Sequence, residues 1–310
     1  MEKKVLLAVD GSAASLSAAD YLGLMEAAVL DDLWVTIFHV LDQAPPALRQ
    51  EAALDPAAYN RLRALERRIA RRGQAVLDLA RERLLAQGLA PERVQLKSHP
   101  RQAGLARDIL FEAERGVYDA VVLGRRGLSK PHQTLAGSVT NKVIQHADRA
   151  PVWVVGGTVE SRRVLCALDR CPGSLAAVDH LAFMVGGNPH CRVTLFHVAP
   201  HLARLASLRH DADDIQRLAQ GMIDHDHRQM EGLLDQARAM LGQAGLGPDQ
   251  VEYQEVAASS VTKAILDAVA QGDYGTVVLG RRGEGGAFWL GHVADRLLAA
   301  CDSASLWVVG

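Results

Sequence analysis

The chain repeats itself, and this duplication limits its fold more than any other feature. Short apolar segments recur in the same order along the second half of the 310 residues. The matching segments are 5–10 with 164–169, 35–40 with 193–198, 121–127 with 277–283, and 153–156 with 307–310. Because internal self-similarity indicates a repeated structural unit, we expect two domains, a first half of residues 1–157 and a second half of residues 158–310.

Within each half, apolar runs alternate with helical patterns. In the first half we predict strands at 5–9, 33–40, 94–97, 120–123 and 152–155, and helices at 13–29, 56–87, 102–115 and 138–146. Strands that are apolar at nearly every position are typical of parallel sheets with helices on both faces. The alternation therefore predicts an α/β fold with one doubly wound, parallel, five-stranded sheet in each half. Ligands of such sheets bind beyond the carboxyl ends of the strands, where the strand order reverses.

Composition indicates a soluble cytoplasmic protein without a nucleic-acid or membrane partner. The chain is 49% hydrophobic and 23% charged, and its formal net charge of −2 provides no overall attraction for phosphate backbones. No segment approaches the roughly 18 apolar residues of a membrane span, and the apolar run after Lys4 is too short for a signal peptide. The four cysteines form no CxxC pair, so we expect reduced thiols.

A glycine-rich segment follows the fourth predicted strand of the first half. This first loop, residues 124–139, contains Gly124 and Gly127 and, nine residues later, Gly137-Ser138-Val139 at a predicted helix start. Glycine lets the backbone approach a phosphate closely, and the N–H groups of a helix N-terminus attract anions. The spacing predicts a phosphate-binding site, although a glycine turn before an ordinary helix cap would give the same pattern.

The chain resembles the universal stress protein family, in its ATP-binding branch. The resemblance covers both halves and rests on Val9-Asp10-Gly11-Ser12, on Gly-x2-Gly-x9-Gly-Ser in the first loop, and on Ala147-x3-Pro151-Val152-x-Val154-Val155. It implies an adenine nucleotide alpha hydrolase-like fold with strand order 3-2-1-4-5, which binds ATP, ADP or AMP with Mg²⁺. It also implies that tandem halves pair edge to edge through their last strands as a pseudo-dimer, and it allows a homodimer of whole chains.

The resemblance further implies one nucleotide site in the first half. Asp10 would contact adenine or ribose, and the main chain at Val40 would contact the edge of the adenine. The ribose and the first phosphate would lie against Gly124, Arg125 and Gly127. The outer phosphates would lie against Gly137, Ser138 and Val139.

The second half keeps only part of this pattern. Its second loop, residues 280–293, reaches the next helix after seven residues instead of nine, with His292 in place of Ser138. A shorter loop moves the helix start, and histidine is bulkier than serine and mostly neutral at pH 7. We expect weak nucleotide binding or none here, and a different small anion stays an alternative. The residues of this degenerate second site are Asp169, Val198, Gly280, Gly283, Gly291 and His292.

Three functions fit these observations. The first is a nucleotide-dependent sensor or regulator of the stress response, with the nucleotide held mainly in the first half. The second is a slow ATPase or phosphotransferase, although the sequence has no Gly-Lys-[Ser/Thr] loop and no kinase His-Arg-Asp, and no residue is assigned a catalytic role. The third is a scaffold that binds no nucleotide.

Histidines and charged helices add weaker hypotheses. His39 and His197 end matching strands and are interpreted as structural. His225 and His227 lie two positions apart on a predicted helix, so their side chains point in different directions and no protein metal site is assigned. The long helical segment of the first half is rich in Arg and its counterpart is rich in Asp, so the two could meet across an interface.

Overall fold

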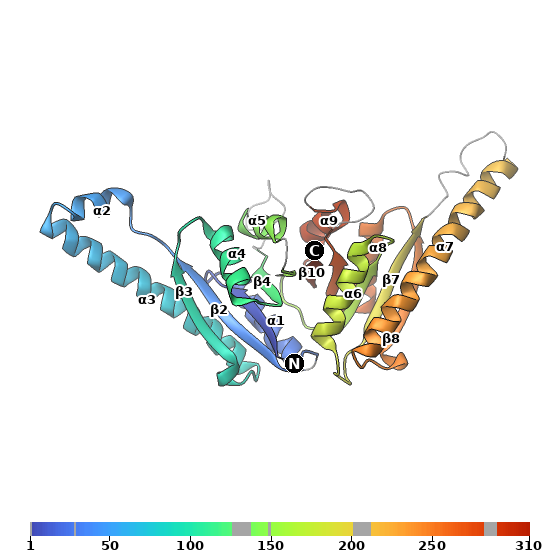
Figure 1. Cartoon of the computed structure of the whole chain (residues 1–310), viewed down its shortest axis with the longest axis horizontal. Helices are drawn as coiled ribbons and strands as arrows, with labels where there is room; N and C mark the ends of the chain where they lie inside the picture. The colour runs from blue at the N-terminus through green and yellow to red at the C-terminus, as the bar shows by residue number, and fades with distance from the viewer. Residues whose placement is uncertain (1, 28, 126–137, 148–149, 201–211, 282–289) are drawn as a thin grey trace.

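The computed structural model describes residues 2–27, 29–125, 138–147, 150–200, 212–281 and 290–310 (Figure 1). The first half contains β1 (Lys3–Ala8), α1 (Ala13–Glu26), β2 (Leu33–Leu41), α2 (Pro46–Ala52), α3 (Pro56–Ala86), β3 (Val94–Pro100), α4 (Leu105–Gly116), β4 (Ala120–Gly124), α5 (Ser138–His146) and β5 (Val152–Val155). The second half contains β6 (Arg163–Leu168), α6 (Pro172–Val185), β7 (Val193–Pro200), α7 (Ala212–Gln243), β8 (Val251–Ala258), α8 (Val261–Gly272), β9 (Tyr274–Gly280), α9 (His292–Ala300) and β10 (Ser305–Val309).

The strands form one continuous ten-stranded sheet of order β3-β2-β1-β4-β5-β10-β9-β6-β7-β8. Within each half the neighbouring strands are parallel, and the first half has the expected order 3-2-1-4-5. The expectation of two separate sheets is incomplete, because β5 and β10 pair antiparallel and join them. This pairing through the last strands is the one that the family resemblance implied.

Helices cover both faces of the sheet. Helices α1, α3, α6 and α7 pack on one face, and their core contains residues of both halves, among them Val5, Leu22, Leu181 and Trp307. Helices α4, α5, α8 and α9 pack on the other face around a second core. The inner strands are therefore buried on both sides, which explains why their sequences are apolar at nearly every position.

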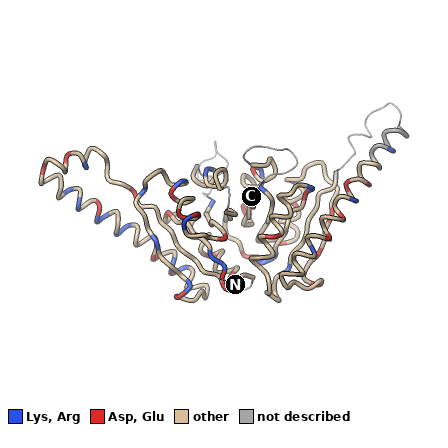
Figure 2. The backbone as a smooth tube through the Cα atoms, in the orientation of Figure 1, with Lys and Arg blue, Asp and Glu red and all other residues tan. Residues whose placement is uncertain are grey.

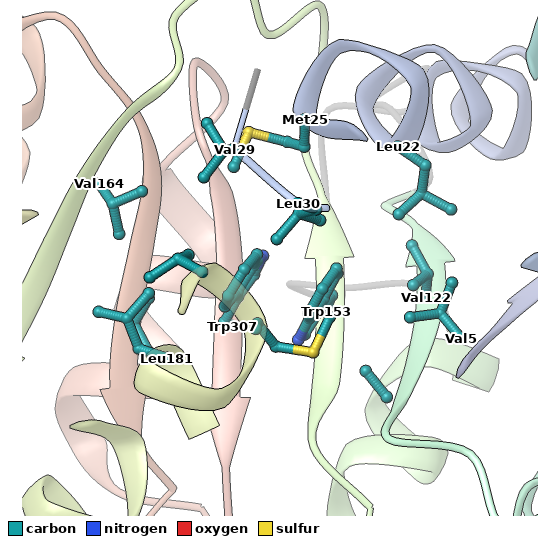
Figure 3. Close-up of a cluster of buried hydrophobic side chains, with 14 of the residues drawn as sticks. Val5, Leu22, Met25, Val29, Leu30, Val122, Trp153, Val164, Leu181 and Trp307 are labelled. Atoms are coloured by element: carbon teal, nitrogen blue, oxygen red, sulfur yellow. The ribbon is translucent and has the colours of Figure 1, made fainter. Parts of the chain in front are cut away.

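Two tryptophans form the centre of the joint between the halves (Figure 3). Trp153 and Trp307 lie opposite each other in β5 and β10, with ring centroids 3.8 Å apart and planes 2° from parallel. The indole Nε1 of Trp307 donates to the hydroxyl of Tyr21 at 2.9 Å, and that of Trp153 donates to Nε2 of His180 at 3.0 Å. Each indole N–H thus donates to a side chain of the other half. The two tryptophans therefore join the halves by hydrogen bonds as well as by apolar contact.

The long helices extend away from the sheet at its two ends. Figure 1 places α2 and α3 at the β3 end and α7 at the β8 end, and Figure 2 shows the charged residues along them. The short helix α2 was not expected from the sequence. Helix α3 follows the N-cap residue Asp55, whose carboxylate accepts from two backbone N–H groups. Because α3 and α7 lie at opposite ends, their charges cannot pair within one chain.

Other local features follow from simple causes. Helix α4 begins at Leu105 rather than at residue 102, because the Asp108 carboxylate accepts from the backbone N–H groups of Gln102 and Ala103 at 2.9 Å each. The four cysteines, all within the described residues, are thiols rather than disulfides, and burial raises the pKa of Cys166 to about 12. Across the described residues, no helix is long and apolar enough to cross a bilayer.

Candidate functional site

A pocket opens at the carboxyl ends of β1, β2 and β4, where the strand order reverses. Its empty volume, including the open mouth, is about 580 Å³. That size is within the usual range of roughly 300 to 1,000 Å³ for small-molecule sites. Its walls combine an apolar part from the strands and α4 with a polar part from the α1 and α5 turns. The lining residues are Ala8, Val9, Asp10, Ser12, Ser15, Phe38, His39, Val40, Leu105, Ile109, Leu123, Gly124, Val139 and Thr140.

Asp10 lies on the exposed lip of this pocket. Its Oδ1 accepts the backbone N–H of Ser12 at 3.0 Å, and the Ser12 hydroxyl in turn accepts the backbone N–H of Ser15 as the N-cap of α1. Gly11 between them has a positive φ of 78°. The turn therefore holds the carboxylate at the end of β1, facing the pocket that it lines.

Gly124 has a packing role as well as a place in the pocket. A Cβ atom at this position would overlap the carbonyl group of Ala14 and the backbone nitrogen of Ser15 in the first turn of α1. Only glycine lets β4 end this close to α1. The sequence predicts that this glycine makes room for a phosphate, and the structure shows that it also allows a close approach to the chain's own backbone.

The N-terminal turn of α5 contributes to the wall of the same pocket. The helix begins at Ser138, and Val139 and Thr140 line the pocket. Thr140 is buried. Gly127 and Gly137, which are expected beside the phosphates, lie outside the described residues. Thus the described part of the predicted site brings Asp10, Val40, Gly124 and Val139 together around one cavity.

Arg125 follows a different course from the one expected. Its backbone N–H donates to the carbonyl of Val155 at 2.7 Å. Its guanidinium reaches the second half, where Nη1 donates to the carbonyls of Leu298 at 2.6 Å and Cys301 at 3.0 Å. Nη2 forms an ion pair with Asp302. The side chain is buried by these contacts, and it is not among the residues that line the pocket.

In the second half, the carboxylate of Asp169, the counterpart of Asp10, accepts hydrogen bonds from its own turn. Asp169 Oδ1 accepts from the Ser174 hydroxyl at 2.6 Å and from the backbone N–H of Cys171 at 3.0 Å. Gly280 again permits a close backbone approach, since a Cβ there would lie 2.8 Å from the carbonyl carbon of Gly173.

The helix end of the second site and its strand β7 are also described. His292 is the first residue of α9, directly after its N-cap Gly291. Val198 is half-buried in β7. Gly283 lies outside the described residues.

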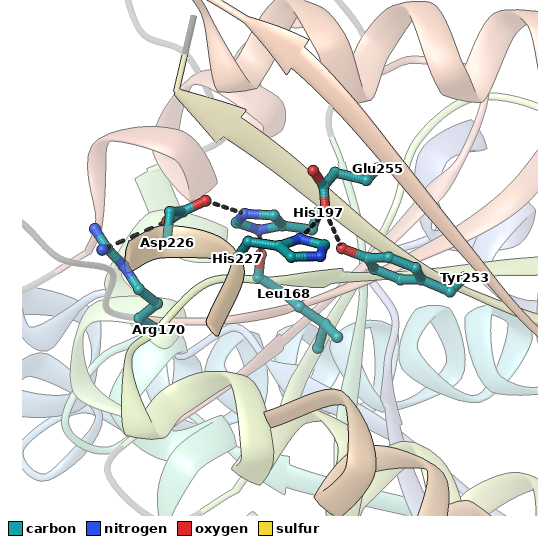
Figure 4. A network of polar contacts seen from close by, with 7 residues as sticks. All are labelled: Leu168, Arg170, His197, Asp226, His227, Tyr253 and Glu255. Atoms are coloured by element: carbon teal, nitrogen blue, oxygen red, sulfur yellow. Dashed lines mark hydrogen bonds and ion pairs between the residues drawn. The ribbon is translucent and has the colours of Figure 1, made fainter. Parts of the chain in front are cut away.

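A buried ionic network next to this turn was not predicted (Figure 4). His197 Nδ1 lies 3.1 Å from the carbonyl oxygen of Leu168, and Nε2 lies 3.0 Å from Oδ2 of Asp226 in α7. Arg170 Nη1 approaches the other carboxylate oxygen at 3.4 Å. Both ring nitrogens thus lie within hydrogen-bond distance of an oxygen atom, which fixes the orientation of the ring.

The signal for this network was present in the sequence. Asp226 interrupts the apolar stripe of α7 that continues with Met230, Leu234 and Ala237, and a charged residue in such a stripe requires a buried partner. In the first half, His39 makes the same contact with a carbonyl, of Val9 at 2.8 Å, but α3 presents Gly73 next to its ring. Among the described residues, no three His, Cys, Asp or Glu side chains gather as a metal site.

Comparison with known proteins agrees with this architecture. The model of the universal stress protein family matches residues 1–156 and 160–309. Universal stress protein YxiE of Bacillus subtilis (strain 168) is 27% identical over 158 residues, which cover 50% of this chain and 99% of that protein.

Two solved structures are similar over 99% of this chain. A universal stress protein from Archaeoglobus fulgidus DSM 4304 has a TM-score of 0.64 at 19% identity, with 97% of its own chain covered. A functionally unknown protein from Pseudomonas aeruginosa PAO1 has a TM-score of 0.56 at 13% identity, with 92% covered. At these identities the likeness shows a common fold for the whole duplicated chain.

Proposed function

The chain belongs to the universal stress protein family, and from this premise we propose that it binds ATP in its first half and acts as a nucleotide-dependent sensor or regulator of the stress response. The proposed site consists of Asp10, Val40, Gly124 and Val139 with Gly127, Gly137 and Ser138 of the first loop. Mg²⁺ would accompany the outer phosphates. The nucleotide would shift the balance between conformations that differ in their affinity for a partner.

One observation carries the proposal, namely the division of the first-half pocket into an apolar and a polar part. Phe38, Leu105 and Ile109 form an apolar wall that suits the flat face of a purine. Asp10 at the lip is placed to accept hydrogen bonds from ribose hydroxyls. The N-terminal turn of α5 offers backbone N–H groups and a favourable dipole to the phosphates.

Arg125 has a different part in this proposal from the one that the resemblance implied. Its guanidinium is engaged by the second half, so the positive potential for the phosphates comes from backbone N–H groups rather than from this side chain. The second half is proposed to hold no nucleotide of its own, because His292 replaces the serine at the start of α9 and the second loop is two residues shorter.

Calorimetric titration of the full chain with ATP, ADP, AMP and GTP tests the proposal. We expect saturable binding of adenine nucleotides and its loss in Gly127→Asp and in Ser138→Asp, since a carboxylate in the first loop repels phosphate. Gly283→Asp is the matched control, because it places the same charge at the repeated position of the second loop and leaves ATP affinity unchanged. Circular dichroism establishes that each variant is folded.

Two results would contradict the proposal. Wild-type protein that binds no adenine nucleotide would leave the third function, a scaffold. Equal losses of affinity in Gly127→Asp and Gly283→Asp would show that the first loop has no special role. Release of inorganic phosphate over hours, compared between wild type and Ser138→Ala, separates a binding protein from a slow ATPase.

A further inference from the structure

The second residue of each glycine-rich loop is an arginine whose side chain contacts the opposite half. Arg125 follows Gly124 at the end of β4, and Arg281 follows Gly280 at the end of β9. Both side chains are buried, with 6% and 7% of the residue surface exposed. Both backbone N–H groups donate to the last strand of their own half, at Val155 and Val309. The two arginines are therefore equivalent by the internal repeat.

The guanidinium groups reach the ends of two equivalent helices. Arg281 Nη1 donates to the carbonyl of Ala147, directly after α5, at 2.7 Å. Arg125 Nη1 donates to the carbonyls of Leu298 and Cys301 at the end of α9, where Asp302 adds an ion pair. The last carbonyls of a helix have no partner within the helix and carry a partial negative charge, so a buried guanidinium stabilises them.

These helices are the ones whose first turns follow the two glycine loops. Val139 and Thr140 in the first turn of α5 line the pocket of the first half, while the C-terminal end of the same helix meets Arg281. A nine-residue helix spans about 13 Å in about two and a half turns, and the hydrogen bonds between these turns couple its two ends. A displacement at the end that Arg281 holds would therefore also displace the turn at the pocket.

We propose that Arg281 is a positioning residue for the nucleotide site of the other half. It holds α5 from its C-terminal end, so that the N-terminal turn faces the pocket before any ligand arrives. This inference rests on the proposed function and explains why the second loop keeps an unchanged Gly280-Arg281 pair although its helix start is altered at His292. The pair supports the first site rather than a ligand of its own. Arg125 holds α9 in the same manner.

The experiment compares wild type with Arg281→Met and Arg281→Lys in the full chain. Methionine removes the charge and the donors, and lysine keeps the charge and restores a donor. Arg163→Met is the matched control, because Arg163 Nη1 also donates to a helix-terminal carbonyl of the second half, Gly272 at 2.7 Å, but that helix, α8, does not line the pocket. The readouts are ATP affinity by calorimetry and hydrogen exchange of the α5 amides without nucleotide.

We expect Arg281→Met to weaken ATP binding about tenfold and to speed exchange in α5, in line with the loss of a charged hydrogen bond. Arg281→Lys should recover part of both, and Arg163→Met should change neither. Wild-type affinity in Arg281→Met, or an equal loss in Arg163→Met, overturns the inference. If Arg281→Met does not fold, Arg281→Lys is compared with Arg163→Lys instead. Arg281→Lys should then still bind ATP more weakly than wild type and Arg163→Lys should not, and wild-type affinity in Arg281→Lys or an equal loss in both overturns the inference.

The exchange measurement separates this inference from the proposed function. If wild type binds no ATP, the proposed function fails, while faster α5 exchange in Arg281→Met would still show that Arg281 orders the helix. If wild type binds ATP and α5 exchange is unchanged in Arg281→Met, the proposed function stands and the positioning role is excluded.

Discussion

The indole N–H of Trp153 donates to Nε2 of His180 across the joint between the two halves, with 3.0 Å between the nitrogens. A ring nitrogen that accepts a hydrogen bond carries no proton, so His180 is held in a neutral form. Burial acts in the same direction and lowers the pKa of His180 from 6.5 to about 4. At the equivalent position of the first half, the Tyr21 hydroxyl accepts from Trp307. The backbone of the joint is thus symmetric, whereas the two side chains that accept from the indoles differ, one being a histidine and the other a tyrosine.

The neutral His180 makes the joint sensitive to acid. Between pH 6.5 and about 4 the unfolded chain binds a proton at this residue and the folded chain does not, so stability falls as the pH falls. A pKa lowered from 6.5 to about 4 corresponds to roughly 3 kcal/mol. Urea unfolding at pH 7.5 and pH 4.5 measures this loss. His180→Tyr, which supplies a non-titrating acceptor like Tyr21, should reduce it, and an unchanged loss in that variant would contradict the assignment.

Two Gly→Ala substitutions should have opposite effects on stability. Gly124→Ala places a Cβ against the backbone of Ala14 and Ser15, and we expect it to cost about 3 kcal/mol or more, as overpacking does when backbone must move. Gly232 lies in α7, and a Cβ there would meet no heavy atom within 4 Å beyond the backbone of its own helix. Gly232→Ala should stabilise by about 0.5 to 1 kcal/mol through helix propensity. Thermal unfolding decides both, and a tolerated Gly124→Ala would show that the close approach is not required.

The proposed function predicts a stoichiometry of one nucleotide per chain. Equilibrium dialysis with ATP should saturate near one, because the second loop has lost its serine and two residues of length. We expect His292→Ser to leave the value at one, since restoring the side chain does not restore the length of the loop. Two sites of equal affinity in wild type would refute the proposed difference between the halves.

The charged helices give a prediction about association between chains. Exposed arginines of α3 and exposed acids of α7 lie at opposite ends of one chain, so they can meet only between two copies. If they do, Arg67/Arg68/Arg71/Arg72→Glu should shift sedimentation in low salt from dimer to monomer, as 0.5 M salt should for wild type. Wild type that sediments as a monomer in low salt, or a variant of unchanged size, would exclude this interface.

Repeats and periodicity predicted most of the fold. The apolar runs and their alternation with helical patterns placed the strands and long helices within a few residues, because burial on both faces leaves a clear pattern. The start of α4 and the short α2 were missed, since both depend on local contacts, such as those of Asp108, that have no periodic signature. The joining of the two sheets through their last strands was predicted from the family resemblance and not from the pattern of apolar residues.

The candidate site was predicted less completely than the fold. Asp10, Val40, Gly124 and Val139 do line one cavity, because the carboxyl ends of adjacent parallel strands meet at one edge of a sheet. The course of Arg125 could not be predicted, because it depends on carbonyls 173 and 176 positions away that only the joined sheet brings near. The partnership of His197 and Asp226 likewise depends on how α7 lies over β7.

The antiparallel pairing of β5 with β10 also fixes how assembly responds to dilution. Two separate single-domain chains would form such a pair only above their dissociation constant. Here residues 156–162 connect β5 to β6 and thus join the two halves, and short tethers give effective concentrations in the millimolar range. The paired state therefore persists at any expression level of the protein. Each chain also always supplies two unlike halves, so that neither half has to compete with other copies of the protein for its partner.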